Sequence, residues 1–251
     1  MPDASGAPGC PAEVTLVYLR RMGTMIEFAS NGIDARGYLA VPESGTGPGV
    51  IVVQEWWGLD DGIKAMADRL AANGFVALSP DLYHGELAEH TEMDKAGELM
   101  NSLPPERAAR DMSGAVDALV EHDATTGDGI GVVGFCMGGM LTFVLASLRP
   151  DRVKAAVPFY GYSSGDDGPD LSKIDAKIQG HFAETDDFFP PEGVRALQAS
   201  LDELGKEATL TVHPGTGHAF MSPHDALDTY DETLAETIWP QFTAFLHETL
   251  V

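Results

Sequence analysis

Residues 131–139 read GVVGFCMGG, and this stretch decides the fold. An apolar run ends at Phe135, and a helix-forming apolar segment follows the glycines. A nucleophile flanked by glycines at both second neighbours, between a strand and a helix, is the pattern of a nucleophile elbow, and Cys136 occupies the nucleophile position. Side chains at Gly134 and Gly138 would collide where strand and helix close on each other. The turn therefore predicts a sulfur projecting above the carboxyl edge of a sheet.

A cysteine in this turn stands at the N-terminus of the following helix, where free N–H groups and the helix dipole favour a thiolate. The backbone N–H of Met137 is then a natural donor to an oxyanion. Two other interpretations fit the same residues. Gly-rich turns also bind phosphates, although this one has neither the Walker lysine nor dinucleotide spacing. Cys136 could also be a small buried core residue.

Apolar runs and helical patterns alternate on both sides of the elbow. Strands are predicted at residues 49–53, 75–78, 130–135, 153–159, 177–182 and 208–212. Helices are predicted at residues 60–73, 105–122, 191–204 and 227–249, with a further helix from the elbow through Leu148. Asn31-Gly32 between two β-type segments indicates an edge hairpin. This alternation predicts the α/β class, with a single doubly wound, mostly parallel sheet and helices on both faces, the α/β-hydrolase fold.

The composition predicts one large domain and narrows its partners. We expect a flexible Gly- and Pro-rich arm at residues 1–22 and the α/β-hydrolase domain at 23–251. The net charge of −24 argues against nucleic acid and anionic membrane surfaces as partners and would slow anionic substrates. A structural disulfide between the two cysteines, Cys10 and Cys136, is not expected. Without a signal-peptide pattern or a membrane-spanning run, a cytoplasmic monomer or small homo-oligomer is expected.

A cysteine nucleophile needs a base, and in elbow-type folds the chain order is nucleophile, acid, histidine. His218 lies on a Gly-flanked loop after the last predicted strand, free to reach over the sheet edge. His213 stands at the end of that strand and is expected to pack or cap, and His181 lies inside a strand. The acid is expected after the preceding strand, at Asp186 or Asp187, and the residues alone do not choose between the two.

Six motifs together resemble the dienelactone hydrolase family, from about Met25 to the C-terminus. They read QEWWG at 54–58, PDLY at 80–83, GFCMGG at 134–139, FYG at 159–161, DDFFP at 186–190 and GHAF at 217–220. Cysteine inside the elbow is the most diagnostic of them, because most relatives of this fold use serine.

The resemblance sharpens three assignments. The aspartate of the family precedes its proline by four positions, which implies Asp186 rather than Asp187. A glutamate after the first core strand, matched here by Glu55, is implied to pair with the resting thiol until substrate shifts it. The backbone N–H of Trp56 is implied as the second oxyanion donor beside Met137.

The sequence also departs from the family pattern. Members that open dienelactones hold the substrate carboxylate with two arginines, and the matching positions here are Gly85 and Ser222. Neither residue can bind a carboxylate bidentately, so a carboxylate-bearing dienelactone is not expected as the natural substrate. An apolar or aromatic pocket is predicted instead, and part of this set is expected to belong to the core. The candidate lining residues are Trp56, Trp57, Tyr83, Tyr160, Phe188 and Phe220.

The complete set predicts hydrolysis of a small ester or lactone through a thioester on Cys136, with His218 and Asp186 managing the protons. No cofactor or metal is implied. The alternatives are a thioesterase or simple esterase, a non-catalytic binding protein on the same scaffold, and a redox sensor with a low-pKa cysteine. For the last, the only other cysteine, Cys10, lies on the remote arm.

Overall fold

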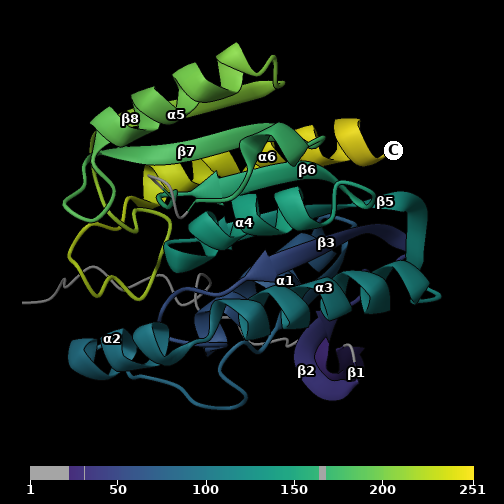
Figure 1. Ribbon diagram of the computed structural model, residues 1–251. Coiled ribbons are helices and arrows are strands. Elements are labelled where there is room, and N and C mark those ends of the chain that lie inside the picture. The colour runs from purple at the N-terminus through teal and green to yellow at the C-terminus, as the bar shows by residue number, and fades with distance from the viewer. Residues whose placement is uncertain (1–22, 31, 164–167) are drawn as a thin grey trace, which may run out of the picture.

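The computed structural model describes residues 23–30, 32–163 and 168–251, so the predicted arm at 1–22 lies outside the described residues. Eight strands form one sheet in the order β1-β2-β4-β3-β5-β6-β7-β8 (Figure 1). They are β1 (Gly23–Ser30), β2 (Ile33–Ala40), β3 (Gly47–Val53), β4 (Val76–Pro80), β5 (Thr125–Phe135), β6 (Val153–Phe159), β7 (Lys177–Thr185) and β8 (Ala208–Gly217). Strands β3 to β8 run parallel, and β2 joins β4 antiparallel.

Helices cover both faces of the sheet. They are α1 (Asp61–Ala72), α2 (Met93–Ser102), α3 (Pro105–Glu121), α4 (Met137–Leu148), α5 (Pro191–Glu203) and α6 (Glu232–Leu250). The buried side chains of α1 and α6 share one hydrophobic cluster, and those of α3, α4 and α5 share another on the opposite face. The predicted doubly wound, mostly parallel sheet with helices on both faces is therefore confirmed.

Strand β3 shows why its sequence reads as an unbroken apolar run. Val50 and Val52 pack into the cluster of α1 and α6, whereas Ile51 and Val53 pack into the opposite cluster. All four side chains are fully buried. A central parallel strand needs apolar residues on both faces, because helices cover both of them.

The predicted edge hairpin is confirmed. Strands β1 and β2 pair antiparallel with Ser30 opposite Ile33, and β1 forms the edge of the sheet. The hairpin extends the sheet beyond β4 and lies far from the elbow in the strand order.

The chain after β8 differs from the prediction. The last helix begins at Glu232 instead of residue 227, because Asp231 caps it by accepting a hydrogen bond from the backbone N–H of Leu234. Before it, the Asp225 carboxylate accepts the N–H groups of Thr229 and Tyr230 and holds the segment in turns. Helix α2, with a single buried residue, was not predicted. Within the described parts of the chain, none of the helices is long and apolar enough to cross a bilayer.

Candidate active site

The elbow adopts the strained geometry that its glycines require. Cys136 joins β5 to α4 with φ +54° and ψ −116°, a left-handed conformation that is costly for a residue with a side chain. A Cβ atom on Gly134 would strike the carbonyl oxygen of Gly138, and one on Gly138 would strike that of Val53. The turn therefore fixes the sulfur at the carboxyl ends of the central strands.

His218 and Asp186 meet over the sheet edge, from loops that follow β8 and β7. His218 Nδ1 lies 2.8 Å from Asp186 Oδ2, and both side chains are buried. The other oxygen, Oδ1, accepts the backbone N–H groups of Phe188 and Phe189, each at 2.9 Å. The neighbouring Asp187 is exposed. A carboxylate fixed on Nδ1 leaves Nε2 of the imidazole as the nitrogen that can accept a proton.

Glu55 lies two residues after the end of β3, buried beside the elbow. Its Oε1 accepts a hydrogen bond from the Tyr160 hydroxyl at 3.4 Å. Its Oε2 lies 3.3 Å from the Ser222 hydroxyl and 3.2 Å from Nε2 of His224. Within the described parts of the chain, the carboxylate is thus held by side chains only, at the long end of hydrogen-bond distances.

The environment of Cys136 opposes ionisation at rest. Burial raises the pKa of the Cys136 thiol strongly, and the negative charge of Glu55 raises it further. Backbone N–H groups of Met137 and Trp56 bond to the sulfur and lower its pKa, but by less. The expected thiolate at the helix N-terminus is therefore not the resting form, because burial and Glu55 outweigh the helix terminus. The convergence of two N–H groups from separate elements on one point is the geometry of an oxyanion hole.

A cavity of about 280 Å³ opens above Cys136 and His218. Its wall is mostly apolar and includes Trp56, Trp57 and Phe188 from the predicted set. The remaining lining residues are Glu55, Met100, Met137, Met140, Phe189, Ala219, Ser222, His224, Asp225, Ala226, Leu227 and Thr229.

Tyr83, Tyr160 and Phe220, also predicted as substrate contacts, do not line this cavity. All three side chains are buried. The Tyr83 hydroxyl donates to the sulfur of Met137, and the Tyr160 ring packs edge-on against those of His218 and Phe220. The three residues lie in the turns that follow β4, β6 and β8, where their rings pack against residues of the site instead of facing the substrate cavity.

The two positions that lack the family arginines lie apart. Ser222 lines the cavity, whereas Gly85 lies beside the guanidinium of Arg36, outside it. That guanidinium forms an ion pair of 2.9 Å with Asp81. Within the described chain, no Lys or Arg lines the cavity.

His224 is a site residue that the sequence analysis missed. It lines the cavity and contacts both Glu55 and Ser222. The available signal was its place six residues after His218, in the segment between the last strand and the last helix. That segment was predicted to become helical at residue 227, which hid its role in covering the site.

The sheet order and the elbow place the protein among the α/β-hydrolases. Within that class, the model of the dienelactone hydrolase family matches residues 35–250, and the chain belongs to this family. It is accordingly a hydrolase of the kind that acts on lactone or ester bonds.

Two relatives from Aquifex illustrate the match. "Protein usf" of Aquifex pyrophilus is 39% identical over an alignment of 240 residues that covers 91% of this chain and 100% of that protein. A protein of Aquifex aeolicus, provisionally named a carboxymethylenebutenolidase, is 36% identical over 229 residues, covering 87% and 95% of the two chains. A crystal structure from Klebsiella pneumoniae, provisionally named a dienelactone hydrolase, has 26% identity and a TM-score of 0.76 and covers 90% of this chain and 98% of its own.

Proposed function

We propose that the protein hydrolyses neutral, apolar carboxylic esters or lactones through a covalent thioester on Cys136. The observation that carries this proposal is the Asp186–His218 pair of 2.8 Å beside the strained Cys136 turn, at the floor of one apolar cavity. Acyl transfer requires a nucleophile, an oriented base and an oxyanion site around one cavity, and all three are present here.

Acylation begins when the thiol loses its proton to Nε2 of His218 as the sulfur attacks the substrate carbonyl carbon. The carbonyl oxygen becomes an oxyanion, held by the N–H groups of Met137 and Trp56. The intermediate then collapses, its C–O bond to the leaving group breaks, and His218 returns the proton to the leaving alkoxide. In a lactone the alkoxide stays tethered to the acyl group.

Deacylation repeats the steps with water. His218 takes a proton from water as the oxygen attacks the thioester carbon, the C–S bond breaks, and the sulfur recovers the proton. Glu55 modulates the thiol: its charge keeps the sulfur protonated until substrate shifts the carboxylate away from it. A neutral resting thiol also disfavours the redox-sensing alternative, which needs a readily ionised cysteine.

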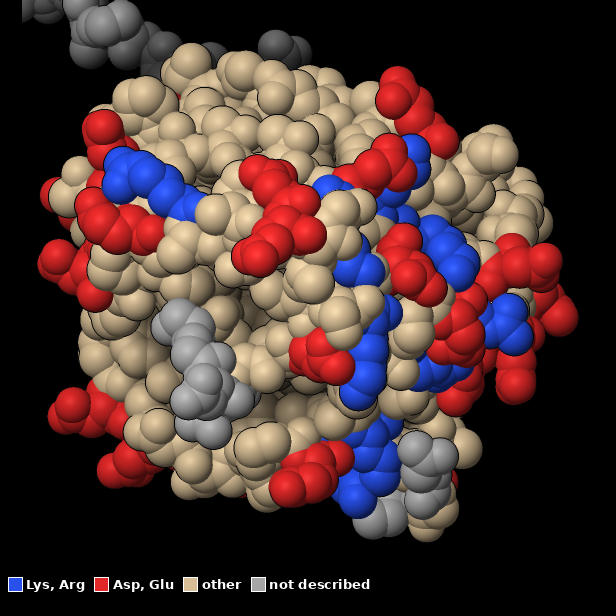
Figure 2. Space-filling view, turned by 45° about the horizontal axis from the view of Figure 1, so that its top comes forward, with Lys and Arg blue, Asp and Glu red and all other residues tan. Residues whose placement is uncertain are grey.

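Charge determines the substrate class. The described residues that line the cavity include no Lys or Arg that could bind a substrate carboxylate. The acidic side chains of Glu55 and Asp225 bring negative charge to the cavity wall. Acidic side chains are scattered over the face shown in Figure 2, with fewer Lys and Arg between them. An anionic substrate would be repelled on approach and left unpaired on binding. The substrate is thus a small neutral molecule.

The location and the oligomeric state of the protein stay predictions from the sequence: a cytoplasmic monomer or small homo-oligomer.

The test is hydrolysis of short-chain p-nitrophenyl esters and neutral lactones by wild type, Cys136→Ala and Cys10→Ala. We expect Cys136→Ala to lose turnover by roughly 10³-fold or more, because the nucleophile is gone. Cys10→Ala, the matched control, should retain it. Intact-protein mass should show an acyl adduct on wild type and on Cys10→Ala only. Full turnover by Cys136→Ala would refute the proposed nucleophile.

A further inference from the structure

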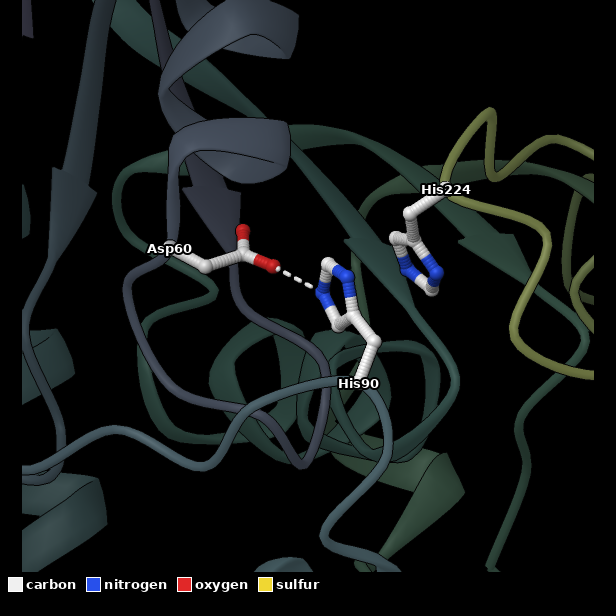
Figure 3. Close-up of side chains that lie close together, drawn as sticks. All are labelled: Asp60, His90 and His224. Atoms are coloured by element: carbon white, nitrogen blue, oxygen red, sulfur yellow. Dashed lines mark hydrogen bonds and ion pairs between the residues drawn. The ribbon is translucent and has the colours of Figure 1, made fainter.

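Three side chains from separate segments gather beside the substrate cavity, and the proposed mechanism uses none of them as a reacting group. Of the three, His224 lines the cavity, whereas Asp60 and His90 lie behind it. Figure 3 shows Asp60, at the start of α1, pointing at the ring of His90, which faces the ring of His224. One donor atom from each residue lies within 4.8 Å of the other two. His90 Nε2 is 2.8 Å from Asp60 Oδ2, and the two imidazole rings stack at 3.6 Å between centroids.

We propose that Asp60, His90 and His224 bind a divalent transition-metal ion, with Zn²⁺ the best-matched probe. Two imidazoles and a carboxylate are a ligand set that zinc accepts, with a fourth position left for water. Ligands about 2.1 Å from a tetrahedral ion lie roughly 3.4 Å apart. The His90–Asp60 pair at 2.8 Å therefore has to open by little more than half an ångström to admit an ion in place of the proton between them. The neutral His90 ring can carry its proton on Nδ1 instead.

His224 completes the site by turning. The two rings lie 20° from parallel, so their in-plane lone pairs do not yet converge, and one ring has to tilt. Nδ1 of His224 is the nitrogen that would bind the ion, because the hydrogen bond that it accepts from the N–H of Ala226 is long, at 3.4 Å, and costs little to break. Nε2 of the same ring keeps its contact with Glu55. A carboxylate behind a metal-bound imidazole is the usual outer-shell support of such ligands.

Accessibility and charge favour a cation at this place. The side chains of Asp60, His90 and His224 are 13%, 32% and 14% exposed, so an ion can reach them without unfolding the loops. Asp60 and Glu55 place two carboxylates beside the two rings. Imidazole selects Zn²⁺, Co²⁺ or Ni²⁺ over Mg²⁺ and Ca²⁺, which prefer oxygen ligands.

The site goes beyond the proposed function, since the ion has no part in acyl transfer. It is nevertheless coupled to that chemistry, because His224 contacts Glu55 and lines the cavity. An ion here ties the ring to α1 and so fixes one side chain of the cavity wall together with its contact to Glu55, which the mechanism requires to move. Zn²⁺ should therefore lower ester turnover reversibly, and a chelator should restore it.

The experiment is calorimetric titration of the full chain with Zn²⁺, in the presence of excess Mg²⁺ to occupy surface carboxylates. We expect one equivalent to bind wild type and Cys136→Ala alike, which separates this site from the thiol. Binding should be lost in His224→Ala and in His90→Gln, which keeps a donor for Asp60 but removes the imidazole. His84→Gln is the matched control, because His84 forms a similar 2.8 Å pair with Asp111 outside the cavity.

Three results would overturn the assignment: no stoichiometric Zn²⁺ binding by wild type, undiminished binding by both His90→Gln and His224→Ala, or loss of binding in Cys136→Ala. None of these results bears on the Cys136 nucleophile, whose test is turnover without metal. Glu55→Gln should weaken Zn²⁺ binding by about tenfold, as outer-shell changes do.

Discussion

Two histidine–carboxylate pairs flank Cys136, and the fold holds them differently. His218 and Asp186 lie 2.8 Å apart, with side chains 7% and 0% exposed, and Asp186 also accepts two backbone N–H groups. His224 and Glu55 lie 3.2 Å apart, and the other partners of Glu55 are hydroxyl groups at 3.3 and 3.4 Å.

The difference separates a fixed pair from an adjustable one. Backbone donors move only if the loop moves, whereas hydroxyl and imidazole donors can rotate away from Glu55. A base must keep its direction through the whole reaction, so short bonds and backbone donors suit His218 and Asp186. A carboxylate that restrains the thiol at rest and then releases it has to move, which suits longer side-chain contacts.

The largest expected effect comes from breaking the fixed pair with Asp186→Asn. The amide presents a donor to Nδ1 of His218 and favours the wrong tautomer, so kcat for p-nitrophenyl acetate should fall by about 10³- to 10⁴-fold. Steady-state kinetics measure this fall. Asp187→Asn, a neighbouring exposed aspartate, is the control and should change kcat little. Equal losses in both variants would contradict the assignment of Asp186.

The sequence indicated where the members of the fixed side would lie, and the choice of Asp186 over Asp187 rested on the family resemblance. The elbow at Gly134, Cys136 and Gly138 can be recognised in the sequence because its strained turn tolerates few residue types. The chain order then locates His218 after β8 and the acid after β7, since parallel strands bring their carboxyl ends to one edge. The sheet was predictable for the same reason, as its buried strands read as apolar runs.

The adjustable side was not predictable from the residues alone. Its contacts depend on the conformation of the segment between β8 and α6, which the Asp225 carboxylate sets through Thr229 and Tyr230. The apolar spacing of that segment favours a helix, but the side-chain hydrogen bonds of Asp225 stabilise a turn instead, and the helix begins only at Glu232. His224 was therefore overlooked. The buried position of Tyr160 likewise depends on its contacts with His218 and Phe220, which are remote in the chain and which motif matching does not resolve.

The second effect tests whether Glu55 restrains the thiol. Glu55→Gln removes a negative charge that raises the pKa of Cys136, so this pKa should fall and the thiolate fraction at pH 7 should rise. A fall of one unit would speed alkylation by iodoacetamide about tenfold at neutral pH and shift the pH–rate profile toward lower pH.

Glu184→Gln, an exposed glutamate on β7, is the control and should leave the alkylation profile unchanged. An unchanged profile in Glu55→Gln would mean that burial alone keeps the thiol protonated, and Glu55 would lose its modulating role. The wild-type rate should in either case keep rising with pH beyond the ordinary range of thiols, because burial raises the pKa in both proteins.

The smallest expected effect comes from removing one contact of the adjustable pair. Ser222→Ala deletes a hydroxyl that lies 3.3 Å from Glu55 Oε2 and 2.6 Å from His224 Nε2. A hydrogen bond of this kind contributes about 1 kcal/mol net, so kcat/KM should change by roughly fivefold at most, and Ser222→Thr should restore it. The effects of Asp186→Asn and Ser222→Ala should then differ by about two to three orders of magnitude. If Ser222→Ala proved as damaging as Asp186→Asn, Glu55 would have to be held as rigidly as Asp186, and substrate could not release the thiol by moving it.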